Sequence, residues 1–100
     1  MTVSMSSGWL IGVMVELAGE PAPVRHFFAV GHADRAKAEW TAIDRAMLIG
    51  GVAASPVKGL EPVHVVGELS PRTAKSLALK PGEVRSLGWK WPRRWLALAQ

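Results

Sequence analysis

The chain has 100 residues, which fits one domain with a modest core, and 49% of its residues are hydrophobic against 20% charged. It holds no cysteine, which excludes disulfides, thiolate metal sites, iron–sulfur clusters and cysteine nucleophiles. The formal net charge of +4 permits binding to nucleic acid or anionic lipid without requiring it. We expect a single domain over residues 1–100 without a transmembrane segment, and the Ala, Arg, Gly, Pro and Val bias suits a bacterial cytoplasmic protein.

Two strands are predicted near the start, after a disordered N-terminus at residues 1–7. In GWLIGVMVEL, residues 8–17, both alternating faces are apolar, which indicates a strand with neighbours on both sides. VRHFFAV, residues 24–30, is rich in β-branched and aromatic residues. The short Gly- and Pro-containing connection between them predicts an antiparallel hairpin.

The clearest predicted element is a helix from Asp34 to Ile49. Asp34 is a suitable N-cap, and Gly50 with Gly51 is a suitable stop. Spacings of four, three and four residues define one apolar stripe, which we expect to lie on the hairpin. Its members are Ala36, Trp40, Ile43 and Met47.

The second half predicts a loop at residues 52–62 that contains a strand of two or three residues, then a strand at 63–69 and a short helix at 71–79. Ser70 and Pro71 suit the N-cap and first position of that helix. KPGE, residues 80–83, fits a type II turn, and alternation predicts a strand from residue 84 to 91. The fold class is therefore α+β: an antiparallel sheet of three to four strands, with one main helix on one face and a short second helix, around a ββαβ-type core.

Motifs that carry catalysis are not found in the sequence. Nucleophile-elbow, phosphate-loop, dinucleotide and metal-ligand spacings are missing, so we predict no catalytic residue, no metal and no cofactor. One alternative is a small-ligand or enzymatic pocket. It would need His26, His64 and Glu68 to converge.

The tail at residues 89–100 is rich in tryptophan and arginine, and cations are concentrated in the last quarter of the chain. It can complete the core, contact a protein partner or second subunit, or bind nucleic acid or lipid through stacking and charge. The candidate binding residues are Arg85, Trp89, Lys90, Trp91, Arg93, Arg94 and Trp95.

These patterns favour a non-catalytic interaction module that associates with itself as a homodimer or with another protein. The tail and an exposed sheet edge are its expected contact surfaces. The first alternative is a nucleic-acid-binding module that uses the basic, Trp-rich C-terminal segment. The second is the ligand or enzymatic pocket described above.

Overall fold

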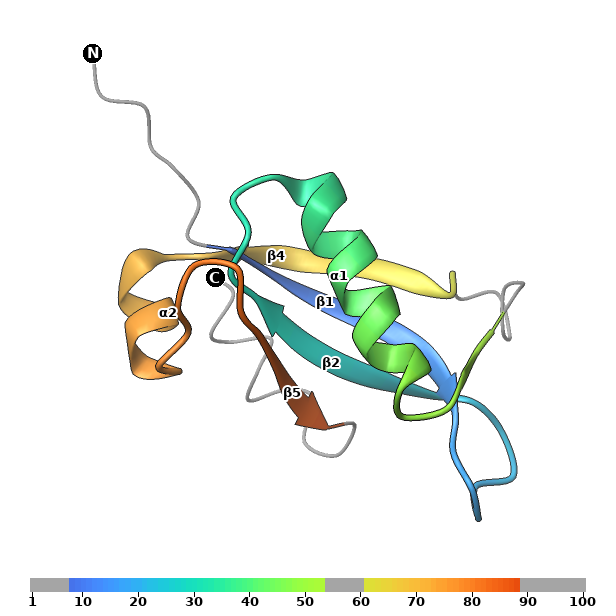
Figure 1. The fold of residues 1–100 in the computed structure, drawn as a ribbon. Coiled ribbons are helices and arrows are strands. Elements are labelled where there is room, and N and C mark those ends of the chain that lie inside the picture. The colour runs from blue at the N-terminus through green and yellow to red at the C-terminus, as the bar shows by residue number, and fades with distance from the viewer. Residues whose placement is uncertain (1–7, 54–60, 89–100) are drawn as a thin grey trace.

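The computed structural model describes residues 8–53 and 61–88, which form an antiparallel sheet of five strands and two helices (Figure 1). The α+β fold class is confirmed, with five strands in place of the expected three to four. The expected N-terminal disorder at 1–7, most of the loop and the tail at 89–100 lie outside the described residues. In chain order the elements are β1 (Gly8–Glu16), β2 (Val24–Val30), α1 (Arg35–Met47), β3 (Gly51–Val52), β4 (Val63–Leu69), α2 (Pro71–Ser76) and β5 (Val84–Gly88).

β1 is the central strand, as its two apolar faces predicted. It pairs with β2 along one side in the predicted hairpin. Its other side pairs with β4 from Gly8 to Val13 and with β3 at Val15 and Glu16. β5 pairs with the outer side of β2, so in the described part of the chain β4 and β5 each have one strand neighbour.

The helix ends follow the capping residues closely. The Asp34 carboxylate accepts hydrogen bonds from the backbone N–H groups of Ala36 and Lys37, which confirms the predicted N-cap. α1 ends at Met47, with Leu48 as its C-cap, two residues before the predicted end. α2 begins at Pro71 as predicted but ends at Ser76, because the chain turns to a positive φ at Ala78.

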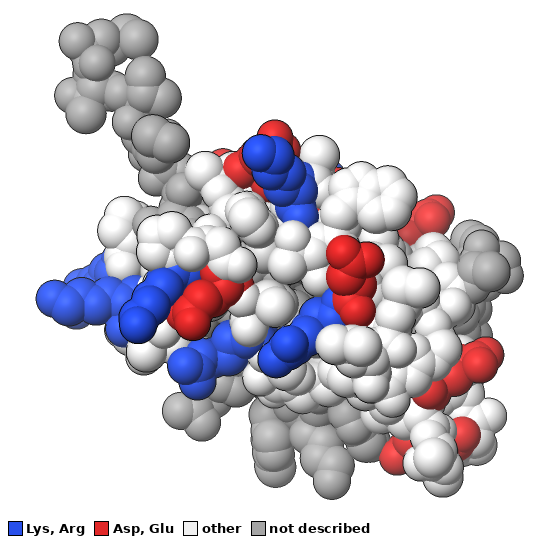
Figure 2. All heavy atoms as spheres, viewed as in Figure 1, with Lys and Arg blue, Asp and Glu red and all other residues white. Residues whose placement is uncertain are grey.

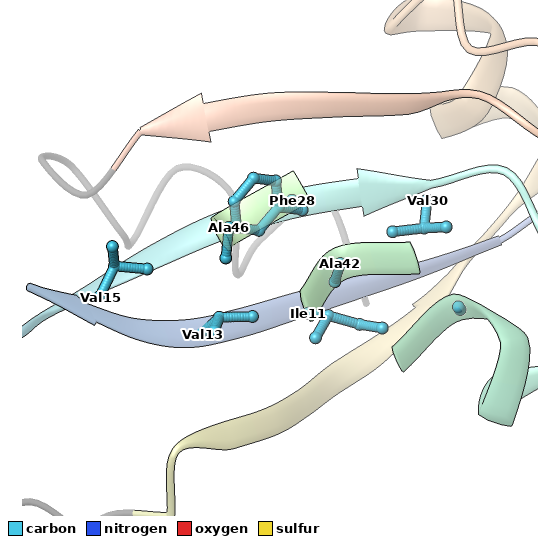
Figure 3. Packing of buried hydrophobic residues seen from close by; sticks show 8 residues of the cluster. Ile11, Val13, Val15, Phe28, Val30, Ala42 and Ala46 are labelled. Carbon is cyan, nitrogen blue, oxygen red and sulfur yellow. The ribbon is translucent and has the colours of Figure 1, made fainter. Parts of the chain in front are cut away.

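The main core lies between α1 and one face of the sheet (Figure 3). Alternation places one set of β1 and β2 side chains on this face. The fully buried members of the set are Ile11, Val13, Val15, Phe28 and Val30. The opposite face has a smaller buried cluster of Leu10, Phe27, Ala29 and Leu69.

Gly31 follows β2 directly and hydrogen-bonds to the turn that precedes β5. Its N–H donates to the Glu83 carbonyl, and its own carbonyl accepts from Gly82 N–H, both at 2.7 Å. A Cβ at this position would overlap the Lys80 carbonyl oxygen, so the close approach requires glycine. Gly82 has a φ of 82° and Glu83 N–H bonds to the Lys80 carbonyl, which agrees with the predicted type II turn.

Candidate interaction surface

Helix α1 turns its small residues toward the sheet and its large ones away. Ala38, Ala42 and Ala46 are fully buried against the core face. Trp40 is 68% exposed and Met47 62% exposed. The expectation that the large apolar stripe lies on the hairpin is therefore wrong.

The physical reason is complementarity of size between helix and sheet. Bulky side chains such as Phe28, Ile11 and Val13 already fill the sheet face, as Figure 3 shows. Alanines spaced four residues apart let the helix backbone approach those side chains closely, whereas a tryptophan there would overfill the core. The alanine at every fourth position was the sequence signal for the inner face.

The outer face of α1 has a continuous apolar stripe. A helix turns about 100° per residue, so Trp40, Ile43 and Met47 fall within a sector of about 60°. Ala36, which is exposed, extends this sector by one turn. Figure 2 views α1 from outside the sheet and shows uncharged surface there, interrupted by acidic and basic groups. We call Ala36, Trp40, Ile43 and Met47 the outer stripe.

Opposite charges lie along one flank of the outer stripe. Lys37 and Asp44 are seven residues apart, so both project on the same side of it, and both are exposed. Glu39 lies on the other flank and is half-buried. One flank therefore carries a cation near the start of α1 and an anion near its end.

Hydrogen bonds fix the start of the helix that carries the outer stripe. The Asp34 cap secures the first turn of α1. The indole Nε1 of Trp9 donates to the Ala33 carbonyl at 3.0 Å, which ties the start of β1 to the residue just before that cap. The outer stripe is thus presented by the same layer that closes the core.

The three residues of the predicted pocket are not brought together. His26 lies opposite Val13 on the helix-facing side of the sheet, and its Nε2 bonds to the Ser86 hydroxyl at 2.5 Å. His64 lies opposite Gly12, hence on the other side of the sheet, and is exposed. Glu68 is exposed opposite Trp9, at the far end of β4. This placement gives no support to a shared site.

A second surface feature is basic. Figure 2 shows Lys and Arg gathered on the side of the molecule where Figure 1 places α2. From Ser70 to Gly88 the sequence has one acidic residue, Glu83, whose carboxylate accepts the Lys80 N–H at 2.8 Å. A groove of about 560 Å³, lined mainly by Ala, Pro and Leu with Lys75 and Lys80, lies beside α2.

Of the seven candidate binding residues near the C-terminus, only Arg85 is described, and it is exposed on β5. The other six, from Trp89 to Trp95, lie outside the described residues. Helical periodicity thus identified the members of the outer stripe, but not that they lie outside the core.

The described residues contain neither a candidate metal-binding cluster nor a helix that could span a membrane. No group of three or more His, Cys, Asp or Glu side chains in this part of the chain is placed to hold a metal ion. None of its helices is long and apolar enough to cross a membrane. Comparison with family models, curated proteins and solved structures finds no significant match to this chain.

Proposed function

We propose that this protein is a non-catalytic interaction module that associates with a second copy of itself through the outer stripe of α1. The main evidence is the exposure of Trp40. Its side chain is 68% exposed, whereas the other large aromatic rings among the described residues lie buried or half-buried. Tryptophan is enriched among the residues that dominate binding energy at protein interfaces. Leaving it in water on an ordered helix forgoes the free energy that burial of its ring would contribute.

Apolar residues toward the end of α1 extend this feature along the helix. Met47 and Leu48 are 62% and 79% exposed, and Ile43 between Trp40 and Met47 is half-buried. Single exposed apolar residues are common and need no explanation, whereas contiguous patches rimmed by polar groups mark interaction sites. Methionine also adapts its shape to a facing surface.

Replacement of Trp40 by glutamate tests the proposal. Sedimentation velocity of the full chain over a concentration series is expected to show a monomer–dimer equilibrium, and Trp40→Glu is expected to weaken it at least about tenfold. The substitution places a charge in the centre of the apolar contact. Because Trp40 is mostly exposed, the variant should keep its circular dichroism spectrum and, at concentrations where the parent is monomeric, unfold within about 0.5 kcal/mol of it.

Arg35→Glu is the matched control, because it introduces glutamate at another exposed position of the same helix but off the outer stripe. It should leave association unchanged. A parent chain that is monomeric at every concentration would contradict the proposed function. Equal association of parent and Trp40→Glu would contradict the outer stripe as its surface.

The sequence also suggested nucleic-acid binding and a ligand pocket. Nucleic-acid binding by the C-terminal segment stays a prediction, since six of its seven residues lie outside the described part of the chain. The ligand pocket also stays a prediction, and the strand register gives it no support, because His26 and His64 face opposite sides of the sheet.

A further inference from the structure

We propose that two copies pack α1 against α1 in antiparallel orientation about a two-fold axis, with Lys37 of each copy facing Asp44 of the other. The inference rests on the proposed self-association and adds its geometry. It depends on the order of charges along the flank of the outer stripe, because this order favours the antiparallel over the parallel orientation.

The outer stripe has the spacing of a two-helix seam. Intervals of four, three and four residues place successive side chains on the line along which two nearly parallel helices meet. An isologous two-fold contact requires a surface that is complementary to itself. In the antiparallel register Trp40 lies level with Ile43 of the second copy, and Ala36 with Met47, so the small side chain meets the long one.

Charge selects the antiparallel orientation. In that register Lys37 lies within about 3 Å along the helix axis of Asp44 of the second copy, and the two-fold axis creates this opposite-charge pair twice. In the parallel orientation, Glu39 of one helix would face Asp44 of the other, which is a like-charge contact repeated twice. The first arrangement attracts and the second repels.

Both charged side chains are available for these contacts. Lys37 and Asp44 are exposed, and within the described residues the polar bonds at Lys37 involve its backbone, not its ammonium. The remaining close acid, Glu39, would face Ala46 of the second copy in the antiparallel register, so it adds no like-charge contact.

Crosslinking of single-cysteine variants reads out the orientation directly, because the full chain contains no cysteine of its own. The variants are Ala36→Cys and Met47→Cys. In the antiparallel dimer residue 36 lies level with residue 47 of the second copy. The two copies of residue 36 are about 16 Å apart along the axis. A disulfide needs Cα atoms within about 7 Å.

Mixing the two variants under mild oxidation should therefore give a disulfide-linked heterodimer, resolved by mass spectrometry when one variant is isotope-labelled. Each variant alone should crosslink at least about tenfold less. Efficient crosslinking of Ala36→Cys with itself would indicate the parallel orientation and overturn the inference. So would a sedimenting dimer that gives no crosslinked heterodimer.

Charge reversal gives an independent measurement. Lys37→Glu should weaken dimerisation about tenfold at low salt, since it turns two attractive pairs into repulsive ones. Lys37→Glu with Asp44→Lys should restore the parent affinity. Arg35→Glu, with the same change of charge in the same helical turn, should have no effect. If Lys37→Glu matches this control, the pairing is wrong, whereas the proposed function fails only if the parent chain is monomeric.

Discussion

Burial of the His26 imidazole lowers its pKa below the ordinary histidine value of 6.5, because the charged form loses its hydration. The ring is 8% exposed, stacks on Phe28 with centroids 4.8 Å apart, and reaches Ser86 through Nε2. Its Nδ1 is buried and has no hydrogen-bond partner among the described residues. Ser86 lies 60 residues away from His26 in sequence, so no local pattern could identify this partner.

We predict that acid weakens the fold through His26. The unfolded chain takes up a proton at this residue near pH 6.5, whereas the folded chain resists it to a lower pH. The free energy of unfolding should therefore fall as pH drops below about 6.5, and the fall due to His26 should stop once pH passes its lowered folded pKa. Urea titrations at a series of pH values measure this. His26→Gln should have a smaller slope in that range, and an unchanged slope would contradict the assignment.

At the level of elements, the sequence patterns predicted β2 and β4 with their observed bounds and the start of both helices. Alternation and capping residues are local signals, and they suffice for this. Strand order is not local: β4 pairs with β1, some 50 residues earlier, through a register that shifts between Leu10 and Ile11. The orientation of α1 was predicted wrongly, because both of its stripes have helical spacing and the bulk of the sheet side chains decides which stripe packs on the sheet.

A larger side chain on the inner face of α1 should lower the stability of the fold, even though the added side chain is hydrophobic. Ala42 is fully buried against the sheet, so Ala42→Leu forces the helix away from its neighbours and should destabilise the protein by about 1–3 kcal/mol. Urea unfolding monitored by circular dichroism measures the loss. Arg35→Leu, at an exposed position of the same helix, should change stability by less than about 0.5 kcal/mol. Equal effects of the two substitutions would contradict close packing at Ala42.

At the scale of the whole molecule, the sequence predicted the small α+β domain that is confirmed, and it predicted a binding segment near the C-terminus, most of which lies outside the described residues. Residues 89–95 are dense in tryptophan and arginine, a composition that is typical of a binding segment. Trp40 has the same side chain within a regular helix, and periodicity there usually reports a core. An apolar stripe on a helix can pack in the core or remain exposed for contact with another molecule. The packing of α1 on β1 and β2 decides between these two cases, because bulky side chains of the sheet leave room only for small residues of the helix.

Self-association must also appear in thermal stability, because a dimer formed only by folded chains shifts the folding equilibrium by mass action. The melting temperature of the parent chain should rise with protein concentration. A gain of about 1 kcal/mol per chain corresponds to about 4–8 °C for a domain of this size. Trp40→Glu should melt at a temperature independent of concentration, near that of the dilute parent. Calorimetry over an approximately hundredfold concentration range distinguishes these outcomes. A parent curve as flat as that of Trp40→Glu would mean that folded chains do not associate through this surface.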